Sequence, residues 1–135
     1  MKANELRIDN LVYWEDKIFP ICQINSAGFY HLRVYGNIIS GLISEGEENK
    51  IKGIPLTEEW LLKSGFEKIL CSAKDNSFKF TKGRQTSSFA VSLYIPEGLC
   101  SVGGAWLEIK VLYVHQLQNL YFSLMGEELT IKKDE

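Results

Sequence analysis

Three cysteines and two histidines are the side chains best suited to metal binding or nucleophilic chemistry. Cys22, Cys71 and Cys100 are widely spaced among apolar neighbours, and no C-x-x-C or H-x-x-x-H pair supplies local chelation. A mixed zinc site that adds His31 and His115 is the alternative to buried free thiols in a reducing compartment, which we favour. We therefore predict no metal, no cofactor and no disulfide framework.

One serine lies in a setting that superficially resembles a nucleophile elbow. Ser101 is followed by glycines, but Leu99 stands where an elbow has its first glycine. We expect a strand next, whereas an elbow needs a strand-to-helix turn, so we predict that Ser101 is a turn residue before a hairpin. Cys100 has no nearby base or electropositive neighbour. The sequence thus favours a protein that is not an enzyme, and an enzyme of unknown class is an alternative.

A basic stretch carries the ingredients of a nucleic-acid surface. This stretch places Lys79 between Phe78 and Phe80, and Lys82 and Arg84 shortly after them. Alternation along a strand places both phenylalanines on one side and Lys79 on the other, so base stacking and phosphate contact would not share a face. Core phenylalanines with solvated lysines are the favoured interpretation. A nucleic-acid-binding module that uses Lys79, Lys82 and Arg84 is the alternative function.

Acidic residues gather between residues 44 and 52. This segment contains Glu45, Glu47 and Glu48 and is polar enough to be a solvated loop. A metal or substrate site is conceivable here, but carboxylates without burial or fixed geometry behave as ordinary surface groups. We take the segment as a boundary between residues 1–52 and residues 53–135, which together form one compact unit.

Composition and charge restrict the class of protein. The chain has 135 residues, is 45% hydrophobic and 24% charged, and carries a formal net charge of −2. These values predict a packed core and no overall attraction to nucleic acid or to an anionic membrane. The first ten residues lack the apolar core of a signal peptide, and no stretch approaches the roughly 20 apolar residues of a membrane span. We expect a cytoplasmic protein.

The elements that would position these groups begin with four short strands, expected at residues 11–15, 18–24, 29–35 and 38–43. The opening LRIDNLV of residues 6–12 is similar to the start of SH3-like small barrels. We predict an SH3-like small β-barrel in residues 1–52. The segment is rich in aromatic residues that could bind extended peptides or serve the core, namely Tyr13, Trp14, Phe19, Phe29, Tyr30 and Tyr35.

The remaining residues predict an α+β unit. Thr57 can cap a helix over residues 57–64, and Gly65 can end it in a left-handed conformation. Apolar residues then recur with period two, which predicts strands at 66–71, 78–80, 89–95 and 106–112, with Leu107, Ile109 and Val111 pointing inward. The expected fold is a four-stranded antiparallel meander, packed with the barrel and flanked by two helices.

A second helix is predicted over residues 115–125 and ends at Gly126. Its apolar face carries Val114, Leu117, Leu120, Tyr121 and Leu124, whereas the opposite arc carries His115, Gln116, Asn119 and Ser123. This arc bears no charge, so it is either covered by the chain itself, which is the favoured interpretation, or meets a partner. We predict that Gln116, Asn119, Phe122 and Ser123 bind a partner.

Two phrases, IPLTEEWLLKSGFE at residues 54–67 and YVHQLQNLYF at 113–122 followed by GEEL at 126–129, support a resemblance. They resemble a family of small proteins encoded in prophages and conjugative elements of gut anaerobic bacteria, whose members also open like residues 1–12. Such families usually have a glycine in the opening phrase, where this chain has Asp9. The family has no established activity, so the resemblance gives no residue a role.

The resemblance implies that the chain is an accessory protein that binds other molecules rather than a catalyst. Our first hypothesis is a non-enzymatic binding or adaptor protein whose partner is another protein or a second copy of the chain. Nucleic acid is the alternative partner, and no membrane partner is expected.

Overall fold

A computed structural model describes residues 6–14, 17–24, 30–34, 37–38, 51–72, 74, 77–83, 90–95 and 97–132 of the chain. The chain divides into two units. The first comprises residues 1–55 and 113–120, and the second comprises residues 56–112 and 121–135. The predicted domains, 1–52 and 53–135, stay a prediction.

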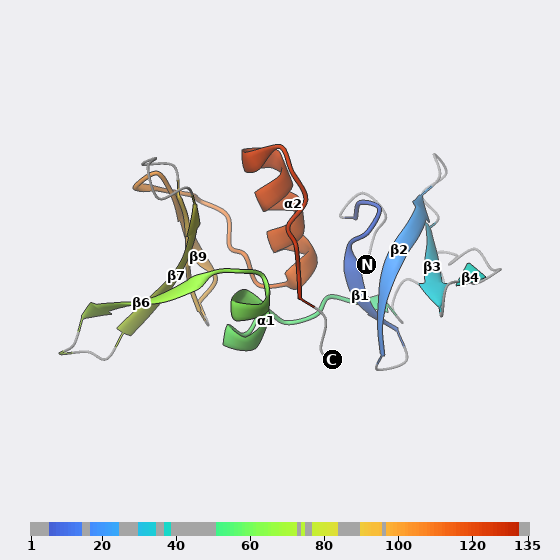
Figure 1. The fold of residues 1–135 in the computed structure, drawn as a ribbon, viewed down its shortest axis with the longest axis horizontal. Helices are drawn as coiled ribbons and strands as arrows, with labels where there is room; N and C mark the ends of the chain where they lie inside the picture. Colours follow the sequence, from blue (N-terminus) through green and yellow to red (C-terminus); the bar gives the residue numbers. More distant parts are fainter. Residues whose placement is uncertain are drawn as a thin grey trace. The chain divides into compact units, whose positions relative to one another are not determined.

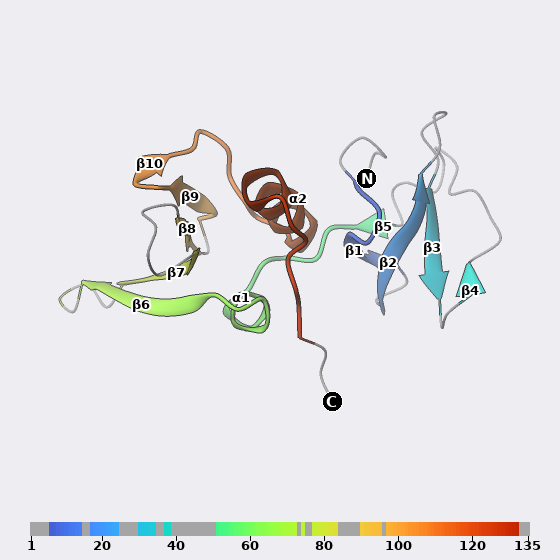
Figure 2. The same cartoon turned by 45° about the horizontal axis from the view of Figure 1, so that its top comes forward.

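The first unit is built on an antiparallel sheet. Its strands are β1 (Leu11–Trp14), β2 (Lys17–Ile24), β3 (Tyr30–Val34), β4 (Asn37–Ile38) and β5 (Ile51–Lys52). The strand order is β4-β3-β2-β1-β5, with β5 beside β1 (Figure 2). The sheet expected from the alternating pattern is therefore present. Within the described residues β4 and β5 do not pair with each other, so the sheet is open there.

The turn that leads into β1 departs from ordinary backbone geometry. Asp9 has a φ of 72°, in the left-handed region that favours glycine. The backbone N–H of Asp9 donates to the carbonyl of Ile21 at 2.7 Å, and the N–H of Arg7 donates to Oδ1 of Asn10 at 2.7 Å. These bonds fix the turn against β2. The buried core of this unit includes Val12, Phe19, Ile21, Ile51, Ile54, Val114 and Leu117.

The second unit begins with a short helix, α1 (Glu58–Lys63), as the sequence predicts. The N–H of Trp60 lies 3.5 Å from Oγ1 of its capping residue Thr57, and Gly65 has a φ of +86° beyond its end. Leu61 is fully buried and anchors the helix. The chain then passes directly into a strand (Figure 1).

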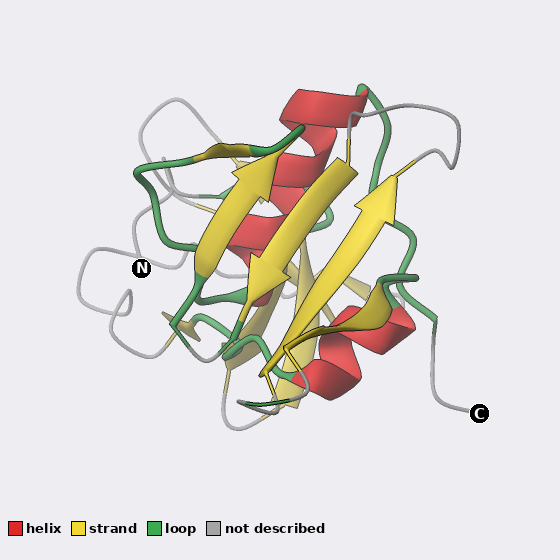
Figure 3. Cartoon of the chain, turned by 90° about the vertical axis from the view of Figure 1, so that its left-hand side faces the viewer, coloured by secondary structure: helices red, strands yellow, loops and turns green. Residues whose placement is uncertain are grey.

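Five antiparallel strands follow: β6 (Glu67–Ser72), β7 (Ser77–Gly83), β8 (Ala90–Tyr94), β9 (Leu99–Val102) and β10 (Ala105–Trp106). They form a meander of order β10-β9-β8-β7-β6. Figure 3 shows strands of this sheet side by side. The register pairs Lys68 with Phe80, and Phe80 with Leu93, and it shifts at a bulge between Leu70 and Ser72. We call the side of the sheet that carries Phe80 and Leu93 the inner face, because both side chains are at most 3% exposed.

The end of this sheet differs from the prediction. The expected strand at 106–112 is wrong beyond Trp106, and Ser101, predicted in a turn, lies within β9. Gly103 and Gly104 have φ values of 58° and 86° and form the two-residue hairpin loop that pairs β9 with β10. Beyond this hairpin, Ile109 is 56% exposed, although Val111 is buried as predicted.

The second helix, α2 (Val114–Met125), is confirmed, and Gly126 follows it with a φ of +72°. Residues 114–120 belong to the first unit and 121–125 to the second. Val114, Leu117 and Tyr121 are buried as predicted. His115 and Gln118 are also buried, so the polar arc does not simply face water. No described helix has the length and apolar character needed to cross a bilayer.

Candidate functional site

The predicted partner surface on α2 is partly used by the first unit itself. Oε1 of Gln116 accepts from the N–H of Tyr113 at 3.1 Å, which is the bond that a third-position glutamine makes in a capping box. Oδ1 of Asn119 accepts from Nδ2 of Asn10 at 2.9 Å and from a guanidinium N–H of Arg7 at 3.4 Å. The carboxamide oxygens of both residues thus stabilise the fold.

The other two predicted partner residues belong to the second unit and face solvent. Phe122 is 39% exposed, and Ser123 is exposed. The sequence did not predict that Gln118, next to this surface, would hold the fold together through hydrogen bonds. Oε1 of Gln118 accepts from the N–H of Leu11 at 2.9 Å, and its Nε2 donates to the carbonyl of Asp9 at 3.2 Å. Gln118 lies outside the uncharged arc of His115, Gln116, Asn119 and Ser123, so that arc gave no signal for this role.

The two described basic residues of the alternative function, Lys79 and Lys82, lie on opposite faces of their strand. Nζ of Lys82 donates to the carbonyl of Ser64 at 2.7 Å and lies 5.2 Å from the ring centroid of Tyr121. Burial lowers the pKa of Lys82, and the charge of Glu127 opposes this shift. Lys79 pairs in register with Ile69 on the other side of the sheet. Arg84 lies outside the described residues.

The three thiols are free but not all buried. Cys100 is fully buried, Cys22 is half-buried and Cys71 is exposed, so the prediction of buried thiols is wrong for Cys71. Its strand, β6, is exposed along nearly its whole length because it is an edge strand. Burial raises the pKa of Cys100 to about 11. A thiol with this pKa is a poor nucleophile.

The histidines and acidic residues do not create a metal centre in the described residues. His115 is buried, and its ring stacks on that of Tyr113 at 5.8 Å between centroids. No group of three metal-ligating side chains occurs in the described parts of the chain. The side chain of His31 and the acidic loop at 44–50 lie outside those parts.

The predicted aromatic cluster of the N-terminal strands is described in part. Phe19 is buried, and its ring meets that of Trp14 edge-on at 5.8 Å between centroids. Tyr13 and Trp14 are half-buried, whereas the side chains of Phe29, Tyr30 and Tyr35 lie outside the described residues. Of the described members, Phe19 therefore belongs to the core, and Tyr13 and Trp14 are partly covered.

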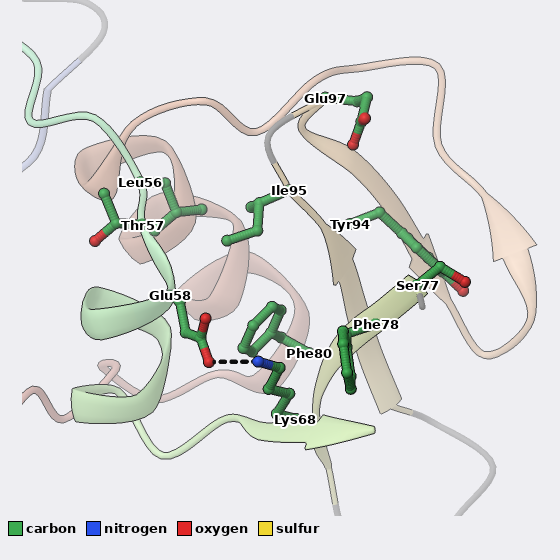
Figure 4. A pocket seen from close by; sticks show the side chains of 10 residues that line it. All are labelled: Leu56, Thr57, Glu58, Lys68, Ser77, Phe78, Phe80, Tyr94, Ile95 and Glu97. Carbon is green, nitrogen blue, oxygen red and sulfur yellow. Dashed lines mark ion pairs between the residues drawn. The ribbon is translucent and has the colours of Figure 1, made fainter. Parts of the chain in front are cut away.

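A pocket of about 570 Å³ in the second unit is the strongest candidate for a functional site. This volume lies within the range of small-ligand and side-chain pockets. Figure 4 shows the ten residues that line it, which come from the segment before α1, the first residue of α1, β6, β7, the end of β8 and the segment after β8: Leu56, Thr57, Glu58, Lys68, Ser77, Phe78, Phe80, Tyr94, Ile95 and Glu97.

The pocket has an apolar interior and a polar rim. Phe80 is only 3% exposed and Leu56 only 9%, whereas Phe78, Tyr94 and Ile95 are half-buried. The polar lining residues Thr57, Glu58, Lys68, Ser77 and Glu97 are all exposed. This arrangement is typical of a surface that binds an apolar group and orients it with a few polar contacts.

One end of the pocket holds an ion pair above an aromatic ring. Nζ of Lys68 lies 2.9 Å from Oε1 of Glu58 and 4.3 Å from the ring centroid of Phe78 (Figure 4). Glu97 lies at the other end, and within the described residues no basic group forms an ion pair with it. The ring of Tyr94 also contacts that of Trp106, at 5.1 Å between centroids.

Local sequence explains each part of the pocket but not its assembly. The pairing of β6 with β7 brings Lys68 next to Phe80 on the inner face, and Leu70 next to Phe78. Leu56 is held by its N–H, which donates to the carbonyl of Leu112 at 2.9 Å. The sequence predicted Phe78 and Phe80 as core residues, which is correct for Phe80.

The charged groups of the pocket are accessible to solvent. Its carboxylates and ammonium group are exposed and lie at the rim, where water screens them. None of the candidate nucleophiles from the sequence, Cys100, Ser101 or the other cysteines, lines it.

Comparisons with known proteins assign no relationship. No family model, curated protein or solved structure matches the chain.

Proposed function

We propose that the chain is a non-enzymatic binding protein that acts through protein–protein contacts, with the pocket as the site that receives a side chain of the partner. The observation that supports this proposal is the half-buried apolar lining of the pocket, about 570 Å³ in volume and open to solvent. Burying such a lining against an apolar group stabilises a complex by roughly 25 cal/mol for each Å² removed from water.

The surface beside the pocket extends the apolar contact. Leu70 pairs in register with Phe78 on the inner face and is 49% exposed. Its strand, β6, is the edge strand of the sheet, so a partner that fills the pocket can also contact Leu70. A contact of this extent favours a protein partner over a small metabolite.

The resemblance to proteins of prophages and conjugative elements suggests where the chain works. We propose that the chain is an accessory protein of such an element and works in the cytoplasm, which its free thiols support. We also propose that the first unit has an SH3-like architecture. The order β4-β3-β2-β1-β5, with the fifth strand beside the first, supports this proposal.

The nucleic-acid alternative and the α2 surface both stay predictions. The ammonium group of Lys82 is engaged with Ser64 on the inner face, which weakens the case for a basic patch. Phe122 and Ser123 are accessible, so a partner could still contact this part of α2.

The test uses an array of short immobilised peptides and two matched variants of the full chain. We expect wild-type protein to bind a subset of peptides that contain large side chains, and Phe78→Ala to lose this binding. Phe122→Ala is the control, because it removes a partly exposed aromatic ring away from the pocket. Loss of binding by Phe122→Ala but not by Phe78→Ala would reject the pocket as the site.

A further inference from the structure

We infer that the pocket binds a cationic side chain, lysine or arginine, presented by the protein partner. This inference rests on the proposed binding function and names the chemical group that the pocket receives. The pocket already holds one ammonium group of its own chain, that of Lys68.

Lys68 shows that the pocket can hold a cation. Its Nζ lies 4.3 Å from the ring centroid of Phe78, within the roughly 6 Å range of a cation–π interaction, and 2.9 Å from Oε1 of Glu58. An aromatic face and a carboxylate thus already act together on an ammonium group. The side chain of Lys68 nevertheless remains 37% exposed, so it does not fill the pocket.

The charges of the lining are unbalanced. Glu58 and Glu97 contribute two carboxylates, whereas Lys68 contributes the single ammonium group. Glu58 and Lys68 neutralise each other at one end, which leaves Glu97 at the other end of the pocket (Figure 4). A second cation can therefore enter beside Glu97 and reduce the negative charge of the lining.

Aromatic residues are available to that second cation. Tyr94 and Phe78 both line the pocket; Figure 4 shows the side chain of Tyr94 reaching toward Ser77, and the ring of Phe78 above β6. The methylene stem of a lysine or arginine can pack on the apolar interior while its charged group stays near the rim. An anionic or neutral polar side chain would lack a matching charge there.

The experiment compares capped arginine with capped citrulline, its neutral isostere, by NMR titration of the full chain. We expect arginine to shift the amide signals of Phe78, Tyr94 and Glu97 at lower concentration than citrulline does. Added salt should weaken the binding of arginine but not that of citrulline.

Two variants change the charge of the pocket in opposite directions. Glu97→Gln should weaken arginine binding roughly two- to fivefold, the size expected for a partly exposed charge pair. Lys68→Met should strengthen it by a similar factor, because it leaves Glu58 without its ammonium partner and uncovers Phe78.

Lys63→Met is the matched control for Lys68→Met. Nζ of Lys63 pairs with Oε1 of Glu59 at 3.0 Å and lies 5.6 Å from the ring centroid of Trp60, but neither acid nor base lines the pocket. This variant removes the same type of interaction on α1 and should leave arginine affinity unchanged. An equal gain in both lysine variants would indicate a general charge effect and overturn the inference.

Two further outcomes separate this inference from the proposed function. If arginine and citrulline bind equally well, and Lys68→Met does not raise the affinity for arginine, the preference for a cationic side chain is overturned. The loss of peptide binding in Phe78→Ala would still stand. Absence of any shift at the pocket with either probe would also overturn the inference, whereas the peptide array alone decides the proposed function.

Discussion

Nδ2 of Asn10 donates a hydrogen bond to Oδ1 of Asn119 over 2.9 Å, and so ties the turn before β1 to α2. The two residues are 109 positions apart in the chain, and Asn10 is only 1% exposed. A buried amide without its acceptor costs free energy, because it loses water without gaining a partner. The polar residues that the sequence marks as a partner surface therefore contribute to the stability of the first unit.

Replacing Asn119 tests this role. We expect Asn119→Leu to lower the free energy of unfolding by about 1–3 kcal/mol, since it removes the acceptor of Asn10 and Arg7. Asn119→Asp keeps an oxygen acceptor for both donors and should cost less. Urea unfolding followed by circular dichroism measures both. Equal loss in the two variants would show that the acceptor oxygen is not the important group.

The left-handed backbone of Asp9 gives a second prediction. At a φ of 72° aspartate is tolerated because its short polar side chain can hydrogen-bond locally, and alanine lacks this group. Asp9→Ala should therefore destabilise the protein by about 1 kcal/mol. Glycine adopts it without strain, and Asp9→Gly should stay within about 0.5 kcal/mol of the parent.

Thermal unfolding of these two variants provides the measurement. The same ranking should appear in the urea midpoint. A more stable Asp9→Ala than Asp9→Gly would show that the turn relaxes out of the left-handed region in solution.

Burial of Cys100 predicts a pH dependence of stability. The pKa of Cys100 rises from 9.0 to about 11 because burial disfavours the thiolate. Between these values the folded state keeps a proton that the unfolded state has lost, so stability falls as pH rises. The full loss is on the order of 2–3 kcal/mol, at about 1.4 kcal/mol for each pKa unit.

Cys100→Ala removes this contribution, so its free energy of unfolding should approach that of wild type as pH rises above 9.0. Val91→Ala is the control, since it also truncates a fully buried side chain but has no titratable group. Its difference from wild type should stay constant over the same pH range. A constant difference for Cys100→Ala as well would contradict the prediction.

Elements with local signals could be predicted from the sequence. Thr57 and Gly65 mark the two ends of α1, and Gly126 marks the end of α2, because caps depend on neighbouring residues alone. The sequence did not predict the strand at 99–102. The alternating pattern placed the next strand at 106–112, whereas the two-residue loop at Gly103 and Gly104 pairs residues 99–102 with β10 in a hairpin.

The pocket could not be predicted in the same way. It brings Leu56 and Glu58 together with Phe78 and with Glu97, from three separate parts of the chain. Only the pairing of strands and the path of the chain after β8 decide that these side chains meet. The sequence suggested that both phenylalanines belong to the core. Phe78 is only half-buried, because the inner face of the sheet is not covered beside it.

The bulge between Leu70 and Ser72 lies in an edge strand, where it bears on pairing with strands of other copies. β6 is an edge strand with Ile69 and Leu70 both exposed, and flat apolar edges of this kind recruit strands from other copies into aggregates. A bulge bends the strand and interrupts its regular row of backbone groups, and the charge of Lys68 opposes the approach of an identical edge. Both features disfavour edge-to-edge pairing while the side chains of Ile69 and Leu70 stay exposed to solvent.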